Sequence, residues 1–355
     1  YDTDWTGNVV LGFNGVVMDD YTWDLSMQWH IADYLTNDCC YLQKPEYTEA
    51  ATAFAPGGAG TFKGQSDLFH PDVVAYYTAS PSVTSHSQFR SLEYTFGGPL
   101  KIVPNTDFIA GIQDAEYTYE NIYDKQSEVG NVGGSSGNSS GNARDYTAMF
   151  FETKTSLMDG AGELSVAVRN DDYSDFGTNT SYTVKGLWDV MEGLTLRASV
   201  GTGFRAPGLG DLAANTTFSA DSHTDYVKCN AQGIARADCP SEQVNTYISA
   251  NPNLGPEESE STNIGAIYTF GNHSIAVDIF NTEIDGIITG VSVQNIIDAA
   301  ILGASYTATL ASQGAYCERL NGVADANLQQ CFRNPINGNQ TTVAGTDFKY
   351  NGVFE

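Results

Sequence analysis

Hydrophobic and polar residues alternate one by one through much of the chain, and this period restricts what the chain can fold into. The stretches YTWDLSMQWHI (21–31), GLTLRASVG (193–201) and HSIAVDIF (273–280) each place apolar residues at one parity and polar residues at the other. A period of two predicts β-strands whose faces differ, whereas an amphipathic helix repeats at 3.6. The longest convincing helical stretch is the short VQNIIDAAIL, which starts at residue 293. We therefore expect an all-β protein.

The connections between the expected strands alternate in length as regularly as the residues do. Short turns are expected at 18–20, 102–105, 158–162, 190–193 and 271–272, and longer loops at about 33–85, 123–142, 170–180, 204–256 and 289–342. Up-and-down barrels of outer membranes join their strands by short periplasmic turns and longer extracellular loops. The pattern predicts an antiparallel transmembrane up-and-down β-barrel, with one strand face on outer-membrane lipid and the other on a polar lumen.

The strand count indicates part of a larger barrel. About eleven strands can be placed, whereas single-chain bacterial barrels have an even number of strands. The chain also starts and stops within its strand pattern, at YDTDWTGNVVLGF and FKYNGVFE. We expect residues 1–355 to be part of one outer-membrane barrel domain, as a fragment or a partial structure.

Charge and hydropathy exclude two classes of protein. The net charge is −27, from 43 acidic and 16 basic residues, which argues against a nucleic-acid partner. No run of about 18 apolar residues occurs, so a helical membrane span is not expected. The acidic balance permits steering of a cationic or metal-bearing ligand, and a solvated acidic surface explains it at least as well.

The six cysteines lie in three close sets, all within the expected outer loops. Cys229 and Cys239 are 10 positions apart and Cys317 and Cys331 are 14 apart, so we predict two loop disulfides in an oxidising compartment. Adjacent cysteines rarely bond each other, which leaves the partners of Cys39 and Cys40 open. Without a C-x-x-C pair, and with the histidines scattered, a zinc site is not expected.

Two glycine-rich matches to enzyme motifs fail in their context. GTGFRAPGLGDL (201–212) fits G-x-G-x-x-A, but Pro207 and two further glycines follow where a dinucleotide site needs a helix inside a βαβ unit. GGSSG (133–137) fits G-x-S-x-G, but it lies in a low-complexity segment that we expect to be flexible. We predict no catalytic residues, no enzyme activity and no cofactor.

An acidic cluster is the one metal candidate. Asp171, Asp172 and Asp175 fall in the expected loop at 170–180, and carboxylates at such spacing can hold Ca²⁺. The EF-hand pattern is absent, and we favour an exposed acidic loop over a metal site.

Several separated segments together resemble the barrel of TonB-dependent outer-membrane receptors. They are LRASVGTGFRAPGLGDL, then NPNLGPEESESTNIGAIYTF after a long loop, and then SIAVDIFNTEIDGIITGVS. The resemblance covers most of residues 90–355. Its motif residues look architectural and are Phe204, Arg205, Ala206, Pro207, Asn251, Pro252, Asn253, Leu254, Pro256 and Glu257. Trp188-Asp189 departs from the more basic stretch that the family often has.

The resemblance implies a barrel of about 22 strands in the outer membrane of a Gram-negative bacterium. Such a receptor captures a small nutrient at its loops and imports it past a plug with energy from the TonB complex; no plug or TonB box is recognisable in this sequence. The cargo class (siderophore, vitamin, peptide or carbohydrate) stays open. Loop tyrosines could hold a cationic, peptide-like or sugar-like ligand: Tyr41, Tyr47, Tyr76, Tyr77, Tyr226 and Tyr247. The alternatives are a passive porin of about 12 strands and a surface barrel that acts as an adhesin or phage receptor.

Overall fold

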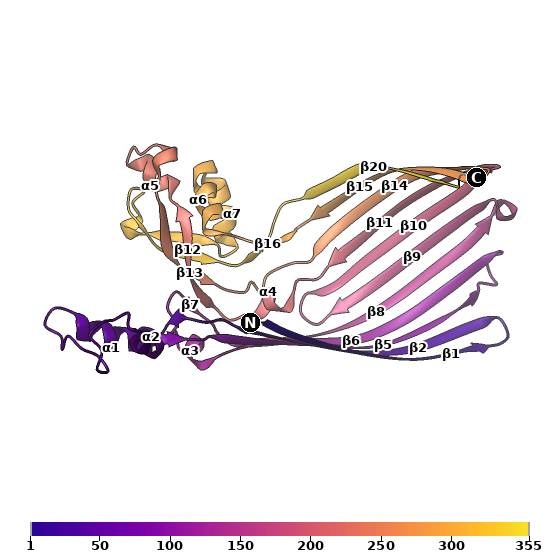
Figure 1. The fold of residues 1–355 in the computed structure, drawn as a ribbon. Helices are drawn as coiled ribbons and strands as arrows, with labels where there is room; N and C mark the ends of the chain where they lie inside the picture. Colours follow the sequence, from indigo (N-terminus) through magenta and orange to yellow (C-terminus); the bar gives the residue numbers. More distant parts are fainter. Residues whose placement is uncertain (1, 354–355) are drawn as a thin grey trace.

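A computed structural model describes residues 2–353 and places eleven strands in one antiparallel sheet, which we call the barrel sheet (Figure 1). The expected strand count is confirmed, and neighbours in the sheet follow chain order. The strands are β1 (Asp2–Val17), β2 (Tyr21–Asn37), β5 (Ser82–Pro99), β6 (Thr106–Tyr123), β8 (Ser140–Leu157), β9 (Gly162–Tyr173), β10 (Gly177–Met191), β11 (Leu194–Arg205), β14 (Glu257–Phe270), β15 (His273–Asp285) and β20 (Thr341–Gly352).

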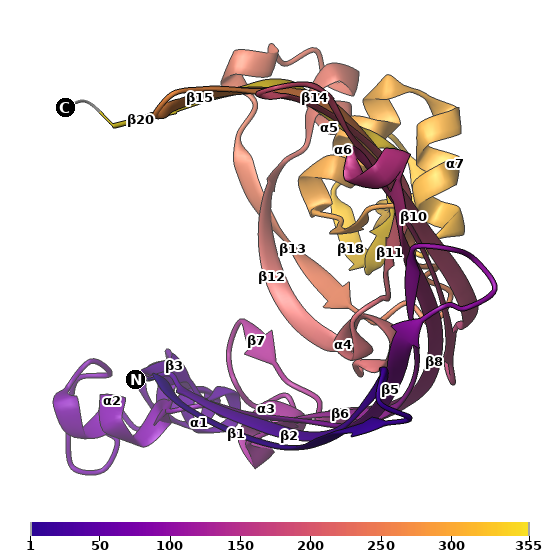
Figure 2. The ribbon, with the colours of Figure 1, turned by 90° about the vertical axis from the view of Figure 1, so that its right-hand side faces the viewer.

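The barrel sheet is an open arc. Figure 2 shows it curving around a central space, with β1 at one end of the arc and β20 at the other. Among the described residues, β1 pairs only with β2 and β20 only with β15 in this sheet, so no closed barrel forms. The curvature follows from the right-handed twist of paired strands. The chain thus supplies a segment of a barrel wall.

Short and long connections lie at opposite ends of the barrel sheet, as the sequence predicts. The five short connections are 18–20, 100–105, 158–161, 192–193 and 271–272, and they form the turn end. The loop end carries 38–81, 124–139, 206–256 and 286–340. The loop expected over 170–180 is wrong in length, because only residues 174–176 separate β9 from β10. Pairing of Asp172 with Thr178 extends the ladder and satisfies backbone groups that a loop would leave to water.

The convex face of the barrel sheet is apolar and the concave face is polar. The register aligns Phe151, Val168 and Tyr182 on one side, and neighbouring Arg197 and Asp278 on the other, where Arg197 Nε donates to Asp278 Oδ1 at 2.8 Å. The short helix α4 (Leu209–Ala213) lies inside the arc, on the polar side (Figure 2). This is the arrangement that lipid outside and water inside require.

Aromatic rings gather where the apolar band meets the turn end. Tyr21 stacks on Phe96 with ring centroids 5.5 Å apart, and Phe108 stacks on Phe151 at 5.9 Å. Further along the sheet, Tyr268, Phe270, His273 and Tyr350 form a continuous stack. Such a row of aromatic rings at one border of an apolar band is typical of outer-membrane barrels.

A charge introduced on the convex face should destabilise the sheet far more than the same charge one residue away. Val166 lies on the apolar face in the middle of β9, and the next residue, Ala167, lies on the polar face. We expect Val166→Arg to reduce the free energy of folding into lipid by about 2–4 kcal/mol. Ala167→Arg is the matched control, with an expected loss under about 1 kcal/mol. Urea titration of the complete receptor in vesicles measures both, and equal losses would contradict a lipid-facing β9.

The turn 158–161 contains the short 3₁₀ helix η1 (Met158–Gly160), and the loops at the loop end carry the other elements. The first loop and the segment 124–139 hold β3 (Tyr41–Leu42), α1 (Lys44–Phe54), α2 (Pro71–Tyr77), β4 (Thr78–Ala79), α3 (Lys125–Glu128) and β7 (Ser135–Ser136). The later loops hold β12 (Thr217–Thr224), α5 (Tyr226–Ala231), η2 (Arg236–Asp238), β13 (Ser241–Ile248), β16 (Ile288–Gly290), α6 (Val293–Leu302), α7 (Ala304–Ser312), β17 (Tyr316–Arg319), η3 (Leu320–Gly322), β18 (Leu328–Arg333) and β19 (Pro335–Asn337).

The helix expected near residue 293 is confirmed as α6, but the expectation that no helix would be longer is wrong. Helix α1 has 11 residues against 10 for α6. Its sequence is rich in alanine and threonine and buries only Ala50, so it shows no wide apolar stripe. No helix among the described residues has the length and apolarity that a membrane crossing needs.

Candidate ligand-capture site

Two long loops far apart in the sequence fold together into one small domain at the loop end. Strands β12 and β13 from the loop 206–256 and strands β17 and β18 from the loop 286–340 form a mixed sheet, which we call the outer-loop sheet, and β13 pairs with β18 in parallel. Helix α6 packs on this sheet, where Val293 and Ile297 contact Val244 and Cys331. We call β12, β13, β17, β18 and helices α5, α6 and α7 the outer-loop domain. Its buried core holds the two loops together. Figure 1 shows this domain beyond the loop end of the barrel sheet.

Two disulfides cross-link the outer-loop domain. Cys229 in α5 bonds Cys239, and Cys317 in β17 bonds Cys331 in β18, so both predicted pairings are confirmed. The structure also pairs Cys39 with Cys40, whose partners the sequence left open because adjacent cysteines rarely bond each other. The described residues thus contain no free cysteine.

Mass mapping of peptides without reduction should recover the two disulfides of the outer-loop domain. We expect one peptide pair joined through Cys229 and Cys239, and a second joined through Cys317 and Cys331. Reduction should lower the stability of the domain by about 2–4 kcal/mol for each bridge, because each closes a short loop in the unfolded chain. Free thiols at both Cys229 and Cys239 in protein from oxidising conditions would contradict the assignment.

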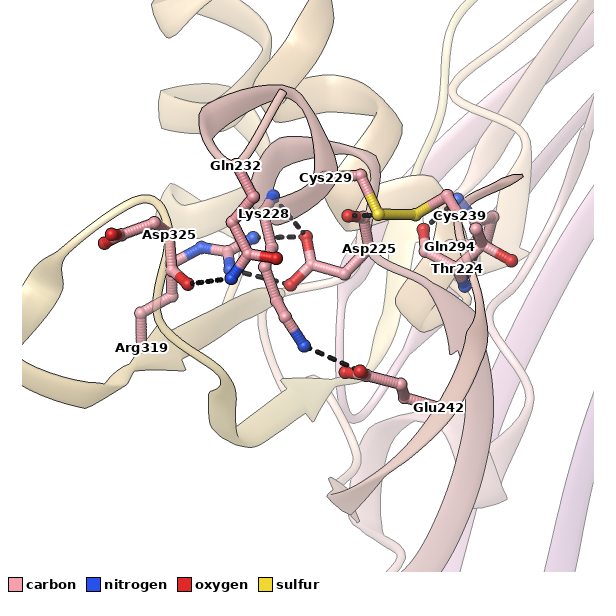
Figure 3. Close-up of a disulfide and its surroundings, with 10 residues drawn as sticks. All are labelled: Thr224, Asp225, Lys228, Cys229, Gln232, Cys239, Glu242, Gln294, Arg319 and Asp325. Atoms are coloured by element: carbon pink, nitrogen blue, oxygen red, sulfur yellow. Dashed lines mark hydrogen bonds and ion pairs between the residues drawn. A yellow bond between two sulfur atoms is a disulfide. The ribbon is translucent and has the colours of Figure 1, made fainter. Parts of the chain in front are cut away.

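A buried ion pair joins α5 to β17 beside the Cys229–Cys239 disulfide (Figure 3). Asp225 caps α5 by accepting from the Lys228 backbone N–H at 3.1 Å, and Arg319 donates to both of its oxygens at 2.6 and 2.7 Å. The Asp225 side chain is 2% exposed and that of Arg319 is 15% exposed. Burial alone would raise the pKa of Asp225, but hydrogen bonds from Arg319 and Lys228 hold it below its usual value.

The predicted architectural motif residues form the stem that joins the outer-loop domain to the barrel sheet. Arg205 ends β11, and its Nε donates to Glu257 at the start of β14 at 2.6 Å. Glu257 also accepts from the backbone N–H of Ile288 at 2.7 Å, so it binds the base of the next loop. Both loops are thereby fastened to the same pair of strands.

The second half of the motif, Asn251 to Glu257, adds further contacts to this stem. Asn251 donates to the carbonyl of Pro335 at 3.0 Å and accepts from the Asn253 backbone N–H at 3.0 Å. Leu254 is buried. Phe204 lies with its ring edge on Tyr173. Ala206 and Pro207 follow β11 directly, Pro252 is exposed in the turn after β13, and Pro256 precedes β14.

Sequence reasoning missed Arg144, which holds this stem against the wall. Its side chain is 7% exposed, although it is a cation in a strand. It contacts Asp175 through three hydrogen bonds of 2.6–3.0 Å and donates to the Pro207 carbonyl at 2.8 Å. Its guanidinium also lies 5.5 Å from the Tyr173 ring centroid and 5.3 Å from that of Phe176. The signal in the sequence was its inward parity on β8, but its partners are distant in the chain.

The Ca²⁺ candidate is not supported. Asp171 is paired with Arg169, Asp175 with Arg144, and Asp172 accepts from Thr178. Strand alternation turns Asp171 and Asp172 to opposite faces, because both lie in β9 and not in a loop. Within residues 2–353, no group of His, Cys, Asp and Glu side chains could hold a metal ion.

The loop tyrosines do not form one ligand surface. Tyr47 and Tyr77 pack edge to face in the core of the first loop, 5.3 Å apart. Tyr247 stacks on Phe332 within the outer-loop sheet, and Tyr226 carries Arg236 over its ring. The remaining candidates, Tyr41 and Tyr76, belong to the first loop.

The glycine-rich segment 133–137, expected to be flexible, contains strand β7. Its Ser136 pairs with Phe218 of β12. The same loop reaches the first loop, because the backbone N–H of Gly133 donates to the Leu42 carbonyl at 2.6 Å and Lys44 Nζ donates to the Gly130 carbonyl at 2.8 Å. This segment therefore connects three loops. The other glycine motif ends in the five-residue helix α4, and β11 pairs antiparallel with β14, which excludes a βαβ unit there.

An up-and-down sheet with an apolar convex face, a polar concave face and a folded domain over one end is the wall of an outer-membrane type of barrel with structured loops. The family model for the TonB-dependent receptor-like β-barrel matches residues 1–354. The chain belongs to this family.

Known relatives agree with this assignment. The chain is 28% identical over 145 residues to the vitamin B12 transporter BtuB of Photobacterium profundum, a match that covers 41% of this chain and 18% of that protein. It resembles the siderophore receptor PirA of Acinetobacter baumannii at a TM-score of 0.62 and 13% identity, over 99% of this chain and 43% of that one. It also resembles a mutant of the ferric enterobactin receptor PfeA of Pseudomonas aeruginosa at a TM-score of 0.62 and 16% identity, over 98% of this chain and 41% of that one. The chain spans less than half the length of these relatives, and the structural matches indicate the fold.

Proposed function

We propose that this chain forms part of the wall and the outer capture domain of a receptor that imports a scarce nutrient across the outer membrane of a Gram-negative bacterium. In this proposal the outer-loop domain binds the cargo, a plug domain gates the lumen, and the TonB complex supplies the energy. The family and the transporter and siderophore-receptor names of the relatives support import at this level.

The observation that carries the proposal is the outer-loop domain itself. Two loops are folded around a common core, stapled by disulfides and tied to the wall through Arg144, Arg205 and Glu257. A small hollow lined by residues that include Arg205, Asp211 and Arg333 lies where this domain meets its stem. A passive pore does not need such a fixed structure at its mouth to conduct solutes, whereas a receptor needs preorganised groups that bind cargo.

Charge narrows the cargo that we propose. Seven arginines of the wall and of the outer-loop domain are paired with carboxylates, whereas the exposed Arg236 lies over the Tyr226 ring; the paired ones are Arg90, Arg144, Arg169, Arg197, Arg205, Arg319 and Arg333. Acidic residues exceed basic ones by 27 over the chain. An anionic chelate would meet repulsion here, so we favour a neutral or cationic cargo.

Depletion of nutrients from defined medium tests the proposal and at the same time identifies the cargo. Mass spectrometry would compare medium spent by cells with the complete receptor, cells without it, and receptor cells that lack TonB. We expect at least one compound whose depletion needs both the receptor and TonB. Depletion that needs the receptor but not TonB, together with steady conductance in planar bilayers, would support the porin alternative and overturn the proposal.

A further inference from the structure

One edge of the outer-loop sheet is only partly paired. Strand β12 runs from Thr217 to Thr224 and pairs along its whole length with β13, but its other edge meets only the two-residue strand β7. In an antiparallel strand, the N–H and C=O groups of alternate residues point to the same side. Both the N–H and the C=O of Thr224 bond the Gln294 side chain and not β13, so by alternation Phe218, Ala220 and Ser222 also direct their backbone groups away from β13.

Amide groups occupy both ends of this edge and leave a gap between them. At one end, the backbone of Ser136 in β7 pairs with Phe218. At the other end, the Gln294 side chain accepts from the Thr224 N–H at 2.9 Å and donates to the Thr224 carbonyl at 3.3 Å, as a peptide group would. No described strand pairs with Ala220 or Ser222 on this side, where the Gln243 side chain donates from Nε2 to the Ala220 carbonyl oxygen at 3.5 Å.

The gap lies where cargo would arrive. In Figure 2, β12 is the strand of the outer-loop sheet nearest the middle of the arc, and Figure 1 places this sheet beyond the loop end. The side chains of Ala220 and Ser222 are small, Ser222 is exposed, and Asp221 between them is paired with Arg333. An approaching chain thus meets backbone donors and acceptors and little steric obstruction.

We propose that the edge of β12 at Ala220–Ser222 binds an extended peptide by strand addition, between β7 and Gln294. The backbone of the peptide would supply the hydrogen bonds that Ser136 and Gln294 supply on either side, and its alternate side chains would point to the two faces of the sheet. That this peptide is the imported cargo rests on the proposed function, whereas the binding itself does not.

Hydrogen exchange of the complete receptor, resolved to single amides, tests the site with a defined probe. The probe is the uncharged pentapeptide acetyl-Thr-Val-Thr-Val-Thr-amide at about 1 mM, a concentration that detects weak binding. We expect exchange at Ala220 and Ser222 to slow by about tenfold, while exchange at Thr224, which is already bonded to Gln294, stays unchanged. The same peptide with all five residues N-methylated should slow exchange less than about twofold, because it lacks the backbone N–H donors that strand addition needs in either register.

Variants at Ser222 separate binding from folding. Ser222→Pro removes the outward N–H and should abolish the effect of the probe, whereas Ser222→Thr keeps the N–H and should retain it. Unchanged exchange at Val244 and intact Cys317–Cys331 would show that both variants fold. The proposal is overturned if Ala220 and Ser222 are already protected without peptide, or if the two peptides act alike. Probe binding without TonB-dependent peptide uptake would retain the site and reject only its role in import.

Discussion

Replacing Arg144 with methionine should reduce the stability of the junction between the outer-loop domain and the wall by about 3–5 kcal/mol, because it leaves the carboxylate of Asp175 without its partner in a mostly buried place. Asp175 is 19% exposed and receives three hydrogen bonds from Arg144. The Pro207 carbonyl also loses its donor. We expect hydrogen exchange in residues 206–214 to accelerate strongly, since this segment starts the loop 206–256.

The exposed pair of Arg90 and Glu116 is the control for this variant. Their side chains are 56% and 36% exposed, so Arg90→Met should change stability by at most about 1 kcal/mol. A second change, Asp175→Asn in the Arg144→Met background, should recover part of the loss, because it removes the unpaired charge. Equal effects of Arg144→Met and Arg90→Met would mean that Arg144 does not hold the stem.

Arg319→Met should destabilise the outer-loop domain by about 3–5 kcal/mol, since the carboxylate of Asp225 is only 2% exposed and keeps its charge at neutral pH. Limited proteolysis between residues 225 and 333 would report the loss. Arg236→Met is the control, because Arg236 is exposed and lies over the Tyr226 ring, an interaction of about 0.5–1 kcal/mol. Resistance to protease equal to that of the control would contradict a structural role for the Asp225–Arg319 pair.

The same ion pair predicts how the outer-loop domain responds to acid. The pKa of Asp225 is lower in the folded domain than its ordinary value of 3.8, so the pair stabilises the domain above that value. The contribution falls as pH drops below about 3.8 and is lost once the folded carboxyl protonates. The domain should therefore stay folded at about pH 5–7, a range above both values, and lose resistance to protease at more acidic pH, and in Arg319→Met this particular pH dependence should shrink.

The wall could be predicted from sequence because its signals are local. Alternation within β11, from Leu194 to Arg205, sets its two faces, and each short turn fixes the register of the hairpin that it closes. Eleven strands, the side of every turn and two disulfides followed from these patterns. The ends of the strands did not, because pairing continues beyond the apolar band wherever a neighbour is available, as at Asp172 and Thr178.

The outer-loop domain could not be predicted because the contacts that form it are non-local. Strand β13 pairs with β18 across more than 80 positions, with Thr246 opposite Cys331. Neither strand carries a clean apolar alternation, because β13 places the polar Thr246 at a fully buried position and β18 has only six residues. Arg144 was missed for the same reason: its inward parity is visible, but its partner Pro207 lies 63 positions away. Strand β7 had no signal, because glycine and serine are permissive of many conformations.

Labelling of single introduced cysteines on intact cells tests the central claim most directly, namely that the wall crosses the outer membrane with the outer-loop domain outside. Ala308→Cys lies on the exposed surface of α7, and Asn272→Cys lies in the turn between β14 and β15. With a membrane-impermeant maleimide and the complete receptor, we expect Ala308→Cys to react in intact cells and Asn272→Cys to react only after the outer membrane is permeabilised. Labelling of both positions in intact cells, or of Asn272→Cys alone, would contradict the account.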